Sequence, residues 1–221
     1  MTESRDLILD HASELYLEDG LDGFSMRKLA RRVGVTAPAL YRHFESRDAL
    51  LMELIRESAQ TMLAYLGRAL AGTSPMDRLR RAGAAYLDFA LDHPRYFLLY
   101  ASLCERLDPE TMEAEVGEGV ESVARFWEDR VRECLQTGAF RPGTPDEIGL
   151  TLWTHAYGFV SLYLGGALGL SEDEVRGAYM ASCIRILNGI AAPGALPHDT
   201  PAPGVPSGNP AADLLHETST P

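Results

Sequence analysis

Basic side chains gather in one short stretch of an otherwise acidic chain. Six of its 20 lysine and arginine residues lie between Ser25 and Arg47, where Glu45 is the one acidic residue. The local charge is therefore +5, while the other 14 basic and 31 acidic residues give −17, for a net charge of −12. Arginine and lysine bind phosphate groups, and a positive stretch on a negative body orients the approach of a nucleic acid. We expect this stretch to contact nucleic acid.

Two short helices are predicted to position these side chains. Ser25 suits an N-cap for a helix that runs to Arg32, and Gly34 suits a left-handed position after that helix. Thr36 suits the cap of a second helix that runs to Arg42, with Pro38 in the first turn, where a missing N–H costs no hydrogen bond. Two short helices joined by a tight glycine-containing turn are typical of a helix-turn-helix, whose second helix enters the major groove.

A solvated helical hairpin, whose arginines serve only solubility, is the alternative interpretation of this segment. Charged runs in helices are more often a solvated face than a binding surface. The near absence of carboxylates around the turn, together with Tyr41 and His43 on either side of Arg42, favours the nucleic-acid interpretation.

The remaining sequence predicts an all-α fold of about nine helices, with an N-terminal three-helix helix-turn-helix domain and a C-terminal helical bundle. Apolar residues repeat at helical spacing from Leu7 to Tyr16, Gly20 ends that run, and no alternating pattern indicates strands. Further helix starts are predicted at Ser46, at Ser74-Pro75, at Asp108-Pro109, and at the capping boxes Thr144–Glu147 and Ser171–Glu174.

We expect three segments along the chain. Residues 1–46 form the DNA-binding domain, residues 47–192 form a ligand-binding and dimerisation domain, and residues 193–221 form a Pro- and Gly-rich tail that is expected to be disordered. No apolar run is long enough for a membrane span, and no secretory signal is visible. Three widely spaced cysteines indicate reduced thiols in the cytoplasm.

An enzyme is not expected. None of the six histidines lies at metal-ligand spacing from another histidine, cysteine or carboxylate, and no nucleophile elbow, P-loop or dinucleotide fingerprint occurs. We therefore predict no catalytic residue, no metal and no cofactor.

The segment "FSMRKLARRVGVTAPALYRHFESRDALL", from Phe24 to Leu51, resembles the N-terminal domain of TetR-family transcriptional regulators. The matching pieces are the apolar residue before the first helix, the LA-x-x-x-GV turn, and "ALYRHF" followed by a charged, capped helix. The resemblance implies an all-helical C-terminal domain that binds a ligand and dimerises, and it implies repression as the commoner mode of action. "DHPRYFLLY" (Asp92 to Tyr100) and "LWTHAYGFVSLYLGG" (Leu152 to Gly166) resemble a subgroup with Trp, His and Gly at set positions. Trp153 and Gly158 fit that pattern, but Tyr157 stands at the place of the histidine, and His155 comes two residues early.

The resemblance implies a set of DNA-binding residues. Arg27 matches a first-helix position from which relatives reach a base, and Lys28 is its basic neighbour. Tyr41 and His43 match phosphate contacts, and Arg47 stands where a lysine usually touches the backbone. Small and apolar side chains at the tip of the recognition helix suit thymine methyl groups, so Arg27, Thr36 and Arg42 would supply most direct readout. The full set is Arg27, Lys28, Thr36, Ala37, Pro38, Ala39, Tyr41, Arg42, His43 and Arg47. Phe44 is predicted to be core.

The C-terminal half is predicted to hold a pocket and a dimer surface. Aromatic side chains line ligand pockets in helical bundles, and the scarcity of charge there indicates an apolar or aromatic effector. The candidate lining residues are Phe97, Tyr100, Cys104, Trp127, Trp153, His155 and Tyr157. Small residues permit close helix approach in the last two helices, Pro145 to Leu168 and Ser171 to Ile190, which are predicted to form a homodimer.

These expectations combine into a ligand-responsive regulator of transcription. We expect a repressor that leaves a palindromic double-stranded DNA operator when a small molecule binds. The alternative is a helical small-molecule-binding or scaffold dimer without DNA-binding activity.

Overall fold

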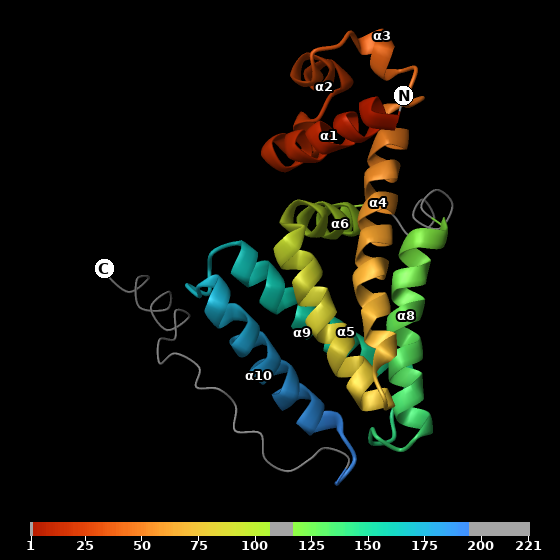
Figure 1. Ribbon diagram of the computed structural model, residues 1–221, viewed down its shortest axis with the longest axis vertical. Helices are drawn as coiled ribbons and strands as arrows, with labels where there is room; N and C mark the ends of the chain where they lie inside the picture. The colour runs from red at the N-terminus through yellow and green to blue at the C-terminus, as the bar shows by residue number, and fades with distance from the viewer. Residues whose placement is uncertain (1, 107–116, 195–221) are drawn as a thin grey trace, which may run out of the picture. The chain divides into compact units, whose positions relative to one another are not determined.

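The chain folds into helices throughout the part that the structure describes. The computed structural model describes residues 2–106 and 117–194, with side chains described within 5–102 and 121–194. These residues form nine α-helices and one 3₁₀ helix, and their one β-type contact is an isolated bridge between Phe140 and Ala191 (Figure 1). The predicted all-α fold is confirmed.

Packing divides the chain into two compact units. The first comprises residues 1–67 and 88–126, and the second comprises residues 68–87 and 127–221. The helices α1 (Thr2–Gly23), α2 (Met26–Val33), α3 (Ala37–Leu40), α4 (Arg47–Gly67) and α6 (Pro94–Arg106) belong to the first unit. The second holds η1 (Arg68–Ala71), α9 (Pro145–Leu164) and α10 (Glu172–Ile190). The helices α5 (Pro75–Asp92) and α8 (Gly117–Gln136) contribute residues to both units.

Local capping chemistry sets the helix boundaries in the first unit. Gly20 interrupts α1 with a φ of 67°, so the predicted break is confirmed, although helical turns resume as far as Gly23. The Ser25 hydroxyl accepts a hydrogen bond from the Lys28 backbone N–H at 3.3 Å, and Gly34 follows α2 with a φ of 80°. The Ser46 hydroxyl accepts from the Ala49 backbone N–H at 2.9 Å at the start of α4. The predicted caps at these three positions are confirmed.

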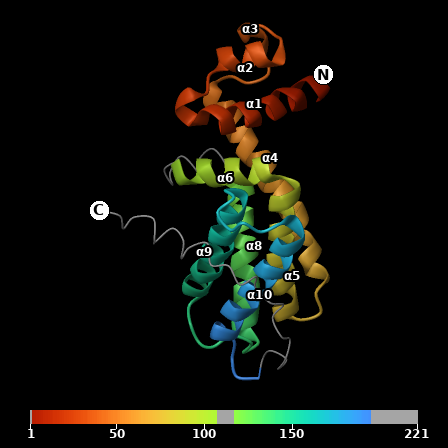
Figure 2. The same cartoon turned by 90° about the vertical axis from the view of Figure 1, so that its left-hand side faces the viewer.

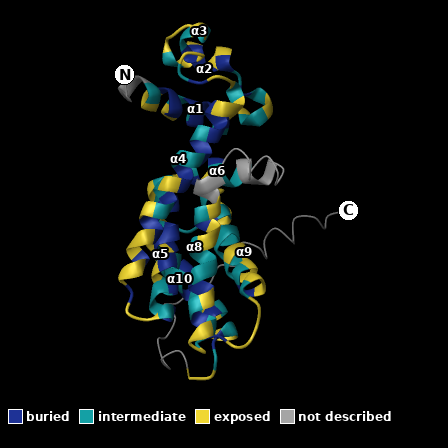
Figure 3. Cartoon of the chain, turned by 90° about the vertical axis from the view of Figure 1, so that its right-hand side faces the viewer, coloured by how far each residue is buried: buried dark blue, intermediate teal, exposed yellow. Residues whose placement is uncertain are grey.

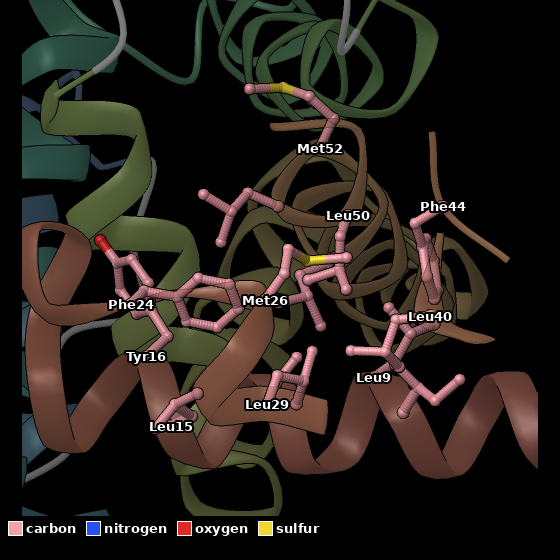
Figure 4. Packing of buried hydrophobic residues seen from close by; sticks show 14 of the residues in the cluster. Leu9, Leu15, Tyr16, Phe24, Met26, Leu29, Leu40, Phe44, Leu50 and Met52 are labelled. Atoms are coloured by element: carbon pink, nitrogen blue, oxygen red, sulfur yellow. The ribbon is translucent and has the colours of Figure 1, made fainter. Parts of the chain in front are cut away.

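One apolar core holds the helix-turn-helix against α1 and α4. Leu29 of α2, Leu40 of α3, and Leu50 and Leu54 of α4 are each fully buried. Figure 4 shows Leu40 directed toward Leu9 of α1 within this core. Burying a leucine side chain stabilises a fold by about 1.5–3 kcal/mol, so each of these helices is fixed by burial more than by its own propensity.

Capping also defines the helices of the second unit. The Thr144 hydroxyl accepts from the Glu147 N–H at 3.3 Å, and the Glu147 carboxylate accepts from the Thr144 N–H at 3.2 Å. The Glu174 carboxylate accepts in the same way from the Ser171 N–H at 2.9 Å. The Ser74 hydroxyl accepts from the Asp77 N–H at 3.1 Å, and α5 begins at Pro75. These predicted helix starts are confirmed, and Asp108-Pro109 lies outside the described residues.

Candidate nucleic-acid interface

The connection between α2 and α3 is a tight turn that glycine makes possible. Gly34 adopts the left-handed region, and its N–H and that of Val35 both donate to the Ala30 carbonyl, at 3.0 and 2.9 Å. Thr36 then takes an extended conformation with ψ of 150°, and α3 begins at Ala37 with Pro38 in its first turn. The chain therefore changes direction within three residues between the two helices, as a helix-turn-helix requires. In Figures 1 and 2, α2 and α3 both lie beside α1.

The second helix is shorter than the sequence predicted. It ends at Leu40, so the predicted helix from Thr36 to Arg42 is wrong at its end. The N–H groups of Arg42 and His43 donate to carbonyls three residues back, on Ala39 at 3.3 Å and Leu40 at 2.9 Å. These hydrogen bonds form a turn after α3. Tyr41, Arg42 and His43 therefore lie beyond the end of the helix.

Two buried side chains fix this short helix to the core. Leu40 is fully buried and Phe44 is 3% exposed, so the prediction that Phe44 belongs to the core is confirmed. The Arg5 side chain of α1 reaches the same turn and donates from Nη1 to the His43 carbonyl at 2.9 Å. The segment from Thr36 to Phe44, the recognition segment, is thus held to the core by its inner face. Its outer face is left to solvent.

The outer face carries most of the predicted contact residues. Thr36, Pro38, Tyr41 and Arg42 are exposed, and Tyr41 has half of its surface accessible. The side chains of Ala37, Ala39, His43 and Arg47 are partly exposed. The Thr36 hydroxyl makes no capping hydrogen bond to its own helix. In Figure 3 exposed residues mark both α2 and the α3 segment.

The four basic residues of α2 fall into two pairs with different surroundings. Lys28 donates to Asp19 Oδ2 and to the Gly23 carbonyl, each at 2.8 Å. Arg32 makes a two-point contact with Glu18, at 2.5 and 2.8 Å. Both partners lie on α1, because residues four apart share a helix face and this face is turned toward α1.

Arg27 and Arg31 form the other pair on α2. Both are exposed, and within the described residues neither has a carboxylate partner. They are also four residues apart, so they present two guanidinium groups on one face. The sequence-based set of binding residues did not include Arg31. Two features point to Arg31 as a binding residue. It lies four residues after Arg27 on the same helix face, and the carboxylates of α1 pair with Lys28 and Arg32 instead.

Two further arginines flank the turn after α3. Arg42 has no carboxylate partner among the residues that the structure describes, whereas Arg47 lies 3.2 Å from its neighbour Asp48. Exposed ion pairs contribute only about 0–1 kcal/mol, so a phosphate can displace such a carboxylate. Among the described residues, Arg27 and Arg31 of α2 and Arg42 after α3 thus have no carboxylate partner, and Arg42 stands between Tyr41 and His43 in the sequence. This arrangement suits a polyanion with accessible hydrogen-bond acceptors.

The candidate ligand-binding residues are distributed over both units. In the first unit Phe97 is 2% exposed, Tyr100 packs against the core, and the side chain of Cys104 lies outside the described residues. In the second unit the Trp127 ring meets the Tyr86 ring edge-on, with 6.1 Å between centroids. His155 Nε2 lies 3.1 Å from Ser182 Oγ, and burial lowers the pKa of His155. Their role in ligand binding stays a prediction.

Trp153 lies on the surface of α9. It is 55% exposed, and its ring stacks on that of Tyr157 with 5.6 Å between centroids. Leu150, one turn earlier, is 59% exposed. Figure 3 shows exposed stretches along α9. An apolar face of this kind is more typical of an interface than of an enclosed pocket.

Two kinds of feature are absent from the part of the chain that the structure describes. No helix there combines the length and the apolar character that crossing a membrane requires. The same residues contain no group of three or more His, Cys, Asp or Glu side chains in an arrangement that could hold a metal ion.

Comparison with known families and proteins gives matches over both parts of the chain. Residues 8–54 match the model described as bacterial regulatory proteins, tetR family, and residues 79–187 match the tetracyclin repressor-like C-terminal domain.

The HTH-type transcriptional repressor KstR2 of Mycobacterium tuberculosis is 24% identical over 136 residues, covering 61% of this chain and 68% of the repressor. The HTH-type transcriptional activator FasR of Mycolicibacterium smegmatis is 33% identical over 88 residues, covering 39% of this chain and 40% of the activator. A protein of unknown function from Rhodococcus sp. RHA1 has a similar structure, with a TM-score of 0.70 and 28% identity, covering 86% of this chain and 96% of that one.

Proposed function

Because the chain belongs to the TetR family of DNA-binding transcriptional regulators, which are not enzymes, we propose that it is a repressor that a small molecule releases from a palindromic operator. The observation that carries the proposal is that Arg27 and Arg31 of α2 and Arg42 after α3 are exposed and have no carboxylate partner among the described residues, on an otherwise acidic chain. Residues 1–46 would bind DNA and residues 47–192 would bind the effector and a second subunit. Because the matching family is one of bacterial regulators, whose target DNA lies in the cytoplasm, we propose that the protein acts there.

The recognition segment would sit in the major groove with its apolar tip against thymine methyl groups. Ala37, Pro38 and Ala39 offer no hydrogen-bonding side chain, so base readout falls to Arg27, Thr36 and Arg42. Tyr41, His43, Arg47 and Lys28 would contact phosphates, and we add Arg31 to that group because it is exposed beside Arg27.

One recognition helix contacts too few base pairs for useful specificity, so we propose a two-fold homodimer. The exposed face of α9, with Leu150 and the Trp153–Tyr157 stack, supports a dimer surface formed by α9 and α10. Burying two large apolar side chains from each copy would supply several kcal/mol. In such a dimer the recognition helices stand about 34–36 Å apart, or a multiple of that distance.

The effector is proposed to be an apolar or aromatic small molecule. The candidate lining residues are Phe97 and Tyr100, with Cys104, within the first unit, and Trp127 and His155 within the second, because Trp153 and Tyr157 are assigned to the dimer surface instead. None of them is Lys, Arg, Asp or Glu, which favours an uncharged ligand. Trp153 and Gly158 fit the Trp-His-Gly pattern, and this partial match supports assignment of the chain to the subgroup that carries it. Release follows if the effector favours a dimer whose recognition helices no longer fit successive half-sites.

Selection of bound duplexes from a random DNA pool tests this function. The expected result is a near-palindrome with two half-sites, whose binding falls steeply with salt at a log–log slope of about −0.9 per phosphate contact. Repeating the selection with individual apolar and aromatic compounds identifies the effector class through loss of enrichment. Failure to enrich any sequence, by a chain that still binds a small molecule, would instead support a helical ligand-binding or scaffold dimer.

A further inference from the structure

One carboxylate of α1 is shared between the helix-turn-helix and α6. Glu14 Oε2 accepts from Arg32 Nη2 of α2 at 3.2 Å, and Glu14 Oε1 accepts from Arg95 Nη1 of α6 at 2.5 Å. His11 Nδ1, one turn earlier on α1, lies 3.5 Å from Oε2. All of these residues belong to the first compact unit.

Each arginine of this bridge depends on Glu14 to a different extent. Arg32 also holds Glu18 through two hydrogen bonds, so it keeps a partner when Glu14 is removed. Glu14 is the carboxylate partner that the structure gives Arg95. The two arginines and the two glutamates therefore form a network of two positive and two negative side chains that joins three helices.

The surroundings of the Glu14 carboxylate favour its ionised form. Burial alone would raise the pKa of Glu14, but the hydrogen bond and charge of Arg95, with smaller contributions from His11 and Arg32, outweigh it and lower that pKa. The Glu14 side chain is one-third exposed, and those of Arg32 and Arg95 are 30% and 55% exposed. The bridge is therefore weak enough to rearrange and accessible to salt.

We propose that Glu14 is a positioning residue that couples α6 to operator binding. Arg95 holds the Glu14 carboxylate from the side of α6, and Glu14 in turn holds Arg32 at the last turn of α2, next to the DNA-facing Arg31. A shift of α6 by one or two ångströms, of the size that helices undergo in switching proteins, breaks the Arg95 contact and alters the restraint on α2. Operator affinity thus depends on a residue that makes no contact with DNA. This inference rests on the proposed DNA-binding function.

The test is a double-mutant cycle measured on the operator duplex recovered by selection. Arg95→Gln is expected to lower operator affinity about two- to fivefold, the range that exposed ion pairs give. In a Glu14→Gln background the same Arg95→Gln change is expected to have no further effect, because the shared carboxylate is already gone. Arg95→Lys is expected to restore part of the affinity, since a lysine can reach the carboxylate through one hydrogen bond.

Arg125→Gln is the matched control, because Arg125 is an exposed arginine of the same unit that pairs with Glu121 of its own helix. It should leave operator affinity unchanged.

Unfolding by urea, measured in parallel, distinguishes the coupling role from a purely structural role of Glu14 and Arg95. If their role is only structural, the urea midpoint of Arg95→Gln falls while the operator affinity of its folded form stays at the parent value. Unchanged affinity for Arg95→Gln, or an equal loss in both backgrounds, overturns the coupling. If the parent chain binds neither the selected duplex nor a mixed-sequence duplex at low salt, the proposed function itself falls and the coupling falls with it.

Discussion

The guanidinium of Arg5 lies over the ring of Phe44, 4.5 Å from the ring centroid. The same guanidinium donates to the His43 carbonyl at 2.9 Å and lies 3.4 Å from a Glu53 carboxylate oxygen. The first turns of α1 therefore hold the chain at the point where the recognition segment ends and α4 is about to begin. Arg5 and Glu53, which are distant in sequence from Thr36–His43, thus help to place the side chains proposed to contact DNA.

Replacing Arg5 with methionine should lower the stability of the first unit without removing a DNA contact. The change keeps an unbranched apolar side chain but loses the cation–π contact and the hydrogen bond, each of which contributes about 0.5–1 kcal/mol at a partly exposed site. Urea unfolding followed by far-UV circular dichroism measures the loss. Arg27→Met, an exposed arginine of the same unit without a carboxylate partner among the described residues, is the matched control and should unfold like the parent. Equal midpoints for both variants would contradict a clamping role for Arg5.

Replacing Arg27 or Arg42 with alanine should weaken operator binding while helicity is unchanged. An arginine that reads a guanine contributes about 1–3 kcal/mol, and its loss relaxes specificity at that base. Arg31→Ala should weaken binding to all sequences and reduce the salt slope by about one. Gel-shift titrations at several salt concentrations measure both effects, with Arg81→Ala, an exposed arginine of the second unit, as the control. A slope that does not change in Arg31→Ala would remove this residue from the phosphate contacts.

Replacing Gly34 with alanine should destabilise the helix-turn-helix although no atom stands in the way. A Cβ there meets nothing within 4 Å, so the cost comes from the φ of 80°, which an alanine adopts at about 1–2 kcal/mol. Gly149→Ala is the matched control, because that glycine lies inside α9 in open space and does not have a positive φ. It should be neutral or stabilising by up to about 1 kcal/mol. Thermal unfolding of both variants makes the comparison, and equal losses would mean that the backbone angle is not the cause.

Replacing Glu57 with glutamine should stabilise the protein at neutral pH but not under acid. Burial raises the pKa of Glu57, and the nearby Asp10, Asp6 and Glu53 carboxylates raise it further, against the hydrogen bond from Tyr96. The folded state thus holds this proton more tightly than the unfolded state does. Stability associated with Glu57 is full below its ordinary pKa of 4.5 and is lost as the pH rises through the higher folded value.

Urea unfolding of Glu57→Gln and the parent as a function of pH checks this sign. The variant should be the more stable protein at pH 7, and its advantage should shrink as the pH falls toward about 4. Glu45→Gln, a change on the exposed surface of the same unit, serves as the control for the loss of one negative charge. An advantage that grows under acid would reverse the assignment.

Replacing Leu150 or Trp153 with glutamate should convert the proposed dimer to monomers. A charge placed on each copy of an apolar interface removes buried area and adds an unpaired, desolvated carboxylate, at a cost of several kcal/mol. Light scattering coupled to size-exclusion chromatography measures the mass, and operator affinity should fall with it. Leu70→Glu, at a residue of η1 that is also about half exposed, should leave the mass unchanged. Dimers that persist in both α9 variants would place the interface elsewhere.

Features with a local cause could be predicted from the sequence, and features set by packing between helices could not. The Ser25 cap, the left-handed Gly34 and the Thr144–Glu147 box each depend on residues within four positions, so the boundaries they define were predicted correctly. The end of α3 at Leu40 depends on how Leu40 and Phe44 enter the core. The division of the α2 arginines and lysine depends on Asp19, Glu14 and Glu18, whose side chains meet α2 only after α1 has packed against it. The exposure of Trp153 escaped prediction because α9 is apolar on more than one face, so its periodicity does not mark the inner side.

The Ala-Pro-Ala tip of α3 has a consequence for how DNA modification would affect recognition. An apolar tip of this kind senses the methyl group at carbon 5 of thymine. In 5-methylcytosine a methyl group occupies the same ring position, and without a hydrogen-bonding side chain the tip has no means of its own to tell the two bases apart. If the tip contacts bases as proposed, methylation of cytosine in the operator would change the affinity of this protein for DNA.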